Sequence, residues 1–104
     1  MAEMKFGADL ITQDGRIGGK ILISSETFTW KPVRFLFIGA GINDITFPIS
    51  QLEGYGKKGT TLAIGVKGYS DLLSFYTWKG SSIINAIQEY NPNFGMYDSN
   101  EIKF

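Results

Sequence analysis

The chain contains neither cysteine nor histidine. Without cysteine it can form no disulfide and no thiolate metal site. Without histidine it lacks the commonest general base and the commonest metal ligand, so no serine–histidine–aspartate triad can be assembled from this chain alone. Among the carboxylates, Asp9, Asp14 and Glu26 are acid–base candidates by residue type only, because no spacing singles out a pair. The sequence therefore predicts a protein that is not an enzyme and that uses no metal and no cofactor.

The chain also lacks a surplus of either charge and any long apolar run. Ten basic residues balance ten acidic ones, whereas proteins that neutralise nucleic-acid phosphates usually carry a basic surplus. The longest apolar run covers residues 35–38, far short of the roughly 20 residues that a membrane-spanning helix needs. Residues 1–5 contain no apolar core typical of a signal peptide. These observations predict a cytoplasmic protein with no nucleic-acid partner.

What the chain does contain fits one compact domain. Its hydrophobic fraction is 43% and its aromatic fraction 14%, values typical of globular proteins rather than disordered ones. Thirteen glycines are spread along the 104 residues, which predicts many tight turns. We expect a single domain over residues 1–104, with strands over about 6–78, a helix over about 81–90 and a tail over 91–104.

The clearest local signal is a pair of strands joined by a polar turn. Ile21 and Ile23 share one face of the first strand, and Phe28 and Trp30 share one face of the second, because side chains alternate along a strand. The four side chains are therefore expected to meet on one side of a hairpin. Upstream, the Asp-Gly pair at 14–15 predicts another hairpin turn.

Further strands are predicted downstream, before the sequence period changes. Alternating apolar residues predict strands at 45–52, 60–66 and 72–78, with a glycine-rich turn at 54–59. After position 81, Ile83, Ile84 and Ile87 follow the spacing of an amphipathic helix. Ser81 or Ser82 is the expected N-cap of that helix. The tail is expected either to fray or to add a strand to this chain or to a neighbour.

Roughly six or seven short strands followed by one helix predict a mainly β fold. The architecture that fits this order best is a pleckstrin-homology-like roll. In such a roll, two near-orthogonal antiparallel sheets form a partly open barrel, and the C-terminal helix caps its open end.

The order of residue types also resembles that of GRAM domains, which are relatives of the pleckstrin-homology fold. Residues 18–32 read GGKILISSETFTWKP, similar to the family segment G-G-K-L-x-L-T-x-x-R-L-x-F-K-P. Residues 47–52 are similar to its I-P-L-x-x-I strand, and residues 62–75 to its L-x-V, turn, x-x-F hairpin. The resemblance covers residues 6–90 and implies a non-catalytic module that binds protein, peptide or lipid.

Four basic residues form one candidate site. Lys57 and Lys58 lie in the glycine-rich segment, where loop amides and ammonium groups can hold an anion. Arg16 and Lys20 flank the first hairpin loop, where lipid-binding relatives of this fold place basic residues. Together these residues predict binding of anionic lipid headgroups as the alternative function. The plainer interpretation is that they are solvated surface charges.

A second candidate site is an apolar segment that contains Arg34, Phe35 and Phe37. If this segment is exposed, it forms a patch for a protein or peptide partner or for a second copy of the chain. If it is a strand of the roll, its side chains fill the core. We expect a protein or peptide partner rather than lipid, because the net charge is zero. Trp30 and Trp78 are expected in the core, with ligand stacking as the alternative.

Overall fold

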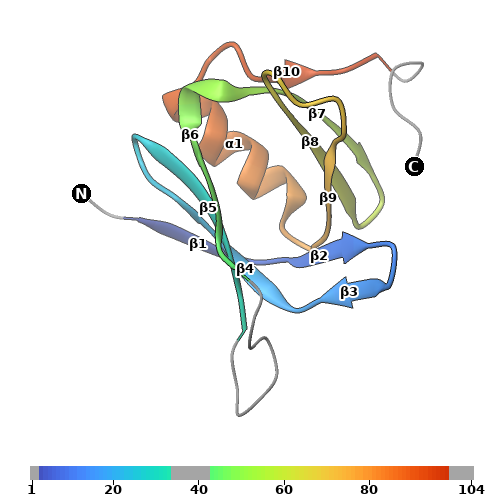
Figure 1. Cartoon of the computed structure of the whole chain (residues 1–104). Coiled ribbons are helices and arrows are strands. Elements are labelled where there is room, and N and C mark those ends of the chain that lie inside the picture. Colours follow the sequence, from blue (N-terminus) through green and yellow to red (C-terminus); the bar gives the residue numbers. More distant parts are fainter. Residues whose placement is uncertain (1–2, 34–42, 99–104) are drawn as a thin grey trace.

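The structure is a computed structural model that describes residues 3–33 and 43–98. Two β-sheets enclose one α-helix, as Figure 1 shows. The first six strands are β1 (Met4–Gly7), β2 (Asp9–Thr12), β3 (Gly15–Ile17), β4 (Gly19–Ile23), β5 (Thr27–Pro32) and β6 (Ile45–Pro48). The remaining elements are the 3₁₀ turn η1 (Ile49–Gln51), β7 (Leu52–Lys58), β8 (Thr61–Val66), β9 (Leu73–Tyr76), α1 (Gly80–Tyr90) and β10 (Gly95–Met96).

The strands form a four-stranded sheet in the order β1-β4-β5-β6 and a six-stranded sheet in the order β10-β7-β8-β9-β2-β3. Among the described strands, neither sheet closes into a barrel. The predicted mainly β fold of two partly open sheets and one helix is thus confirmed. One detail differs from the prediction: β10 pairs with β7 in the parallel sense, while the other pairs are antiparallel.

One bent hairpin joins the two sheets. The chain passes from β1 to β2 through Ala8 and returns from β3 to β4 through Gly18, so each arm changes sheet at this corner. The Ala8 amide donates to the carbonyl of Gly19 at 3.1 Å. The indole Nε1 of buried Trp30 donates to the carbonyl of Ala8 at 3.0 Å. The corner is therefore fixed by hydrogen bonds on both sides of Ala8.

The predicted hairpin core forms as expected. Ile21 lies opposite Trp30 and Ile23 lies opposite Phe28 across the β4–β5 ladder, and all four side chains are fully buried. Phe28 contacts Phe75 of the other sheet edge-to-face, with ring centroids 6.2 Å apart. The hairpin thus supplies the central contact between the two sheets, and its apolar burial is a main source of stability.

Helix α1 packs its apolar face between the sheets (Figure 1). Ile83 and Ile87 are fully buried, as their spacing predicts. The predicted serine cap is wrong. The helix starts at Gly80 with Lys79 as N-cap and no side-chain cap, so Ser81 and Ser82 already lie inside the first turn.

The prediction of one strand at 45–52 followed by a glycine-rich turn at 54–59 is also wrong. The first strand ends at Pro48, the 3₁₀ turn follows, and β7 continues to Lys58 through the glycines. A Cβ atom on Gly54 would lie 2.8 Å from the carbonyl oxygen of Gly95 and 2.9 Å from the ring of Tyr97. Glycine is therefore needed here because the C-terminal segment packs closely against the strand, not because the chain turns.

The described C-terminal segment, up to position 98, joins the core. Phe94 is fully buried, and its carbonyl accepts a hydrogen bond from Gln88 Nε2 at 2.9 Å. The Tyr97 amide donates to the carbonyl of Tyr55 at 2.7 Å, next to the β10–β7 pair. Of the two predicted fates of the tail, this part adds a strand to its own chain.

Replacing Asn91 with alanine is expected to destabilise the fold. The buried Asn91 amide donates to the carbonyls of Ile49 and Leu52, both at 2.9 Å. Its loss leaves two buried carbonyls without their partner, which costs about 1–3 kcal/mol. Urea unfolding would measure the loss, with Asn93→Ala as the matched control because Asn93 is exposed. Equal stability of the two variants would contradict this role for the Asn91 amide.

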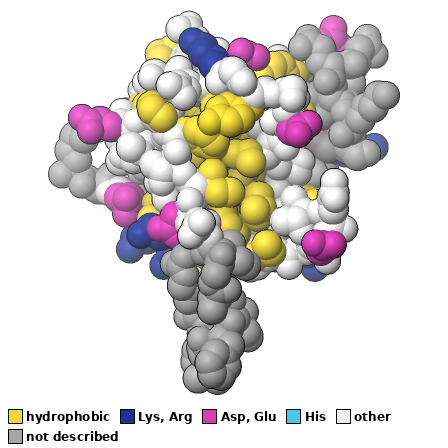
Figure 2. All heavy atoms as spheres, viewed as in Figure 1, with side chains coloured by type: hydrophobic (Ala, Val, Ile, Leu, Met, Phe, Trp, Pro, Cys, Tyr) yellow, Lys and Arg dark blue, Asp and Glu magenta, His cyan; other side chains and the backbone are white. Residues whose placement is uncertain are grey.

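An apolar band lies on the face shown in Figure 2, where hydrophobic side chains gather between β6 and β9. Ile45, Phe47 and Leu73 are half-buried and pack against the core. Tyr69 is 64% exposed and meets Phe47 edge-to-face, with ring centroids 5.4 Å apart. No helix in the described part of the chain has the length and hydropathy needed to cross a membrane.

Candidate functional site

The two tryptophans lie in opposite environments. Trp30 is fully buried as predicted, but Trp78 is 79% exposed, so its predicted place in the core is wrong. A large aromatic side chain that stays in water forgoes several kcal/mol of burial free energy, by the usual figure of about 25 cal/mol per Å². The exposure of Trp78 therefore makes its surroundings the first place to look for a binding site.

Thr77 determines why Trp78 points outward. Its hydroxyl donates to the carbonyl of Gly7 at 2.7 Å and accepts from the Lys79 amide at 3.1 Å. Its own amide donates to the carbonyl of Thr60 at 2.8 Å. These bonds bury Thr77 between β9 and α1. Trp78 follows at a bend just beyond β9, and from there its side chain extends into solvent.

The indole of Trp78 is supported by a neighbouring aromatic ring. Tyr76 meets it edge-to-face, with ring centroids 6.3 Å apart and an interplanar angle of 84°. The guanidinium carbon of Arg16 lies 4.2 Å from the centroid of the Tyr76 ring, a cation–π contact. Arg16, Tyr76 and Trp78 thus form a continuous row of contacts that supports the exposed ring on one side.

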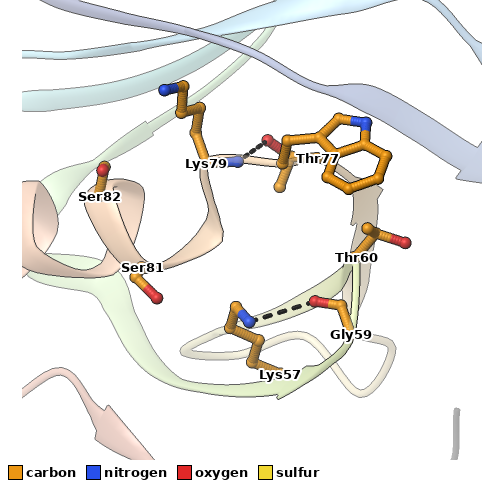
Figure 3. A pocket seen from close by; sticks show the side chains of 8 residues that line it. Lys57, Gly59, Thr60, Thr77, Lys79, Ser81 and Ser82 are labelled. Atoms are coloured by element: carbon orange, nitrogen blue, oxygen red, sulfur yellow. Dashed lines mark hydrogen bonds between the residues drawn. The ribbon is translucent and has the colours of Figure 1, made fainter.

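A surface pocket of about 370 Å³ opens on one side of Trp78. We call it the Lys57 pocket (Figure 3). Its lining consists of Lys57, Gly59, Thr60, Thr77, Trp78, Lys79, Ser81 and Ser82. The lining therefore holds two ammonium groups and four hydroxyls but no carboxylate, a composition that favours an anionic group.

Lys57 is held in place by its neighbours at the start of α1. A Cβ atom on Gly80 would lie 2.9 Å from the Cε atom of Lys57, so the glycine leaves room for the lysine stem to cross the helix. The Lys57 ammonium donates to the carbonyl of Gly59 at 3.2 Å (Figure 3). An ammonium has three donors, so two remain for a ligand.

A second pocket of about 330 Å³ lies next to the first and is also lined by Trp78. We call it the Asp9 pocket. Its lining consists of Gly7, Ala8, Asp9, Gly19, Tyr76, Thr77, Trp78 and Lys79. It therefore lies against the corner of the bent hairpin, and Thr77, Trp78 and Lys79 belong to both pockets. We call the two pockets together with Trp78 the Trp78 surface.

The side chains of the Trp78 surface are of types that bind ligands. Both pockets have volumes at the lower end of the range for ligand sites, about 300–1,000 Å³. Within residues 3–33 and 43–98, no three carboxylates lie close enough together to hold a metal ion. The groups available to a ligand are an aromatic ring, ammonium groups, hydroxyls and the Asp9 carboxylate.

The structure brings only some of the predicted basic residues to this surface. Lys57 lines a pocket, and Arg16 supports the ring of Tyr76. Lys58 lies outside both pockets and pairs with Thr61 across the β7–β8 ladder. Lys20 also lies outside both pockets and pairs with Gly7 and Lys31 in the four-stranded sheet. The four predicted residues thus do not form one cluster around a common pocket.

The predicted apolar interface, Arg34, Phe35 and Phe37, lies outside the described residues, so its role stays a prediction. Sequence reasoning missed Lys79 and expected Trp78 to be buried. One signal was present: in the strand predicted at 72–78, Trp78 shares a face with Ser74 and Tyr76, opposite to Phe75, which is fully buried. In the structure that strand ends at Tyr76. The sequence pattern alone did not decide which of these two faces meets the core.

Comparisons with known proteins provide information on the fold of this chain. Neither a scan against protein-family models nor a search of curated proteins finds a match. The chain is similar to the crystal structure of the C-terminal domain of an unknown protein from Leishmania infantum, with a TM-score of 0.67 and 5% sequence identity. The similarity covers 84% of this chain and 80% of that one. At this identity the likeness shows the fold alone, and the GRAM resemblance stays a prediction.

Proposed function

We propose that this protein is a non-catalytic binding module that engages a peptide segment of a protein partner at the Trp78 surface. The observation that carries the proposal is the 79% exposure of Trp78, which lines two neighbouring pockets. We propose further that the module is of GRAM or pleckstrin-homology-like type and acts in the cytoplasm. Self-association through Arg34, Phe35 and Phe37 is retained as a further proposal for the partner.

The composition of the Trp78 surface supports a peptide ligand. Tryptophan, tyrosine and arginine are the residues most enriched at the energetic centres of protein interfaces, and Trp78, Tyr76 and Arg16 form one stack here. A ring already held by its neighbours loses little conformational entropy on binding. The polar groups of the two pockets then select among the side chains of a peptide.

Selection from a random-peptide library displayed on phage tests this proposal. We expect the wild-type protein to enrich peptides that the Trp78→Ala variant binds at least about 30-fold more weakly, since interface centres contribute 2 kcal/mol or more. Tyr69→Ala is the matched control, because Tyr69 is another exposed aromatic residue, 64% exposed, and lines neither pocket. Peptides that bind Trp78→Ala as tightly as wild type would contradict the proposal.

An anionic membrane surface is the second candidate. One observation favours it: exposed Trp78 lies beside Lys57 and Lys79, and tryptophan with lysine is typical of membrane interfaces. If this function holds, the protein sediments with phosphatidylserine vesicles but not with phosphatidylcholine vesicles, and added salt releases it. Changing Arg16, Lys20, Lys57 and Lys58 to glutamate together then abolishes binding. The leading proposal expects no sedimentation with either vesicle.

A further inference from the structure

We propose that the segment bound at the Trp78 surface carries an acidic side chain for the Lys57 pocket and a basic side chain for the Asp9 pocket. This inference rests on the proposed function, because it specifies the charges of the partner at that same site. A lysine in one pocket and a carboxylate in its neighbour specify the charges of the partner, which the exposure of Trp78 does not. The argument depends on the free charged groups of each pocket and on the position of Trp78.

The Lys57 pocket accepts negative charge. Lys57 and Lys79 contribute its charged groups, and neither forms an ion pair among the described residues. The hydroxyls of Ser81 and Ser82 lie beside them and make no hydrogen bond within the described chain. A carboxylate is an acceptor only, so it matches a lining made of donors.

The Asp9 pocket accepts positive charge. Asp9 is half-buried, and among the described residues its carboxylate makes no ion pair and no hydrogen bond. The neighbouring carbonyls of Gly7 and Ala8 already accept bonds from Thr77 and Trp30. Lys79 lines this pocket too, but no ion pair joins it to Asp9. The Asp9 carboxylate is therefore the free acceptor that a guanidinium or ammonium of the partner would meet.

The two pockets are neighbours, since Thr77, Trp78 and Lys79 line both of them. A peptide that lies over the indole ring can place one side chain in each pocket. In an extended peptide, side chains two positions apart lie roughly 7 Å apart, about the width of an aromatic ring with its contact surface. The expected partner segment therefore has its acidic and basic residues two positions apart, on the same face of the extended peptide.

Nuclear magnetic resonance titration of the ¹⁵N-labelled protein tests the inference. The probes are blocked five-residue alanine peptides with glutamate at the second and arginine at the fourth position, and the same peptide in reverse order. Each of the two peptides has three control versions. In the first glutamine replaces glutamate, in the second it replaces arginine, and in the third it replaces both. The Trp78 indole N–H signal reports binding, and the Trp30 signal reports folding because that group is buried and bonded to Ala8. Trp78→Phe assigns the two signals.

We expect one of the two mixed-charge peptides to bind about threefold more tightly than either singly charged control, the size usual for an exposed ion pair. Lys57→Gln should remove the preference for glutamate and keep that for arginine, whereas Asp9→Asn should do the reverse. Lys67→Gln is the control, since Lys67 is exposed and lines neither pocket.

Two outcomes overturn the inference. If all peptides shift the Trp78 signal with equal affinity, the charges play no part, although the surface still binds peptides and the proposed function stands. If none shifts it at millimolar concentration, the charged-pair inference is wrong. The phage selection then decides separately whether other peptides bind there. The inference is also wrong if Lys57→Gln keeps the preference for glutamate and Asp9→Asn keeps the preference for arginine. The peptide charges would then contact other residues of the protein.

Discussion

Replacing Gly19 with alanine is expected to destabilise the fold by about 3 kcal/mol or more, at the upper end of the range for overpacked sites. The new Cβ atom would lie 2.5 Å from the carbonyl oxygen of Lys31 and 2.6 Å from two ring atoms of Trp30. Neither neighbour can move easily. The Lys31 carbonyl belongs to strand β5, and the Trp30 ring is fully buried and bonded to Ala8.

Gly7→Ala provides the matched control for this corner. Gly7 lies on the other arm of the bent hairpin, has no atom within 4 Å of its would-be Cβ, and does not have a positive φ. We expect the free energy of unfolding of this variant to lie within about 0.5 kcal/mol of the wild-type value, as is usual for surface substitutions. Urea unfolding followed by circular dichroism measures both. Similar midpoints for Gly19→Ala and Gly7→Ala would contradict the close approach of Gly19 and Trp30.

Replacing each tryptophan with alanine is expected to change stability by very different amounts. Trp30→Ala empties the centre of the core and leaves the Ala8 carbonyl without its donor, so we expect a loss of about 3–5 kcal/mol. Trp78→Ala removes a side chain that is 79% exposed, and we expect a change within about 0.5 kcal/mol. Paired urea unfolding curves of the two variants measure the contrast.

A third variant keeps this test decisive if Trp30→Ala does not fold. Trp30→Phe keeps much of the ring volume but removes the Nε1 donor, so it should cost less, about 1–3 kcal/mol for the unpaired buried carbonyl. An equally large loss in Trp78→Ala would show that Trp78 stabilises the fold. The case for a binding surface would then lose its main observation.

The parts of the fold that sequence predicted well are those where local pattern and burial agree. The hairpin with Ile21 and Phe28 is one, because its period of two places every large apolar side chain on the core side. The helix is another, because Ile83 and Ile87 recur at helical spacing. In both segments each residue has a single favourable environment, so one sequence suffices to predict it.

The wrong predictions share a cause in contacts between distant segments. The glycines of β7 predicted a turn, yet Gly54 lies in a strand. It is glycine because Gly95 and Tyr97 pack too closely against it for a side chain. Trp78 was predicted to lie in the core. In the structure, Thr77 turns inward and bonds to Gly7 and Thr60, and the Trp78 side chain extends outward. Neither partner segment is near in sequence, so local pattern could not reveal these contacts.

The candidate site was predictable only in part for the same reason. Lys57 was identified from its glycine-rich setting, but its pocket also needs Lys79 and Trp78 from the link between β9 and α1. Asp9 was noted by residue type alone, and the fold places it in a pocket next to that of Lys57, with Trp78 in the lining of both. A surface assembled from β2, β7 and the start of α1 becomes visible only when these elements are placed together.

The apolar band offers a contrasting account of binding. It includes edge strand β6, which pairs only with β5 among the described strands, and exposed edges can accept an added strand. A partner bound there would contact Phe47 and Tyr69 and leave Trp78 in solvent. The two accounts therefore predict different residues at the interface of any complex.

Chemical-shift mapping of the ¹⁵N-labelled protein with a peptide selected on wild type is the most direct test of the central claim. Our account predicts that the largest changes occur at the Trp78 indole and at the amides of Tyr76 and Lys79, with the Trp30 indole unchanged. Changes concentrated at Phe47 and Tyr69, with the Trp78 indole unmoved, would contradict it and place binding on the apolar band.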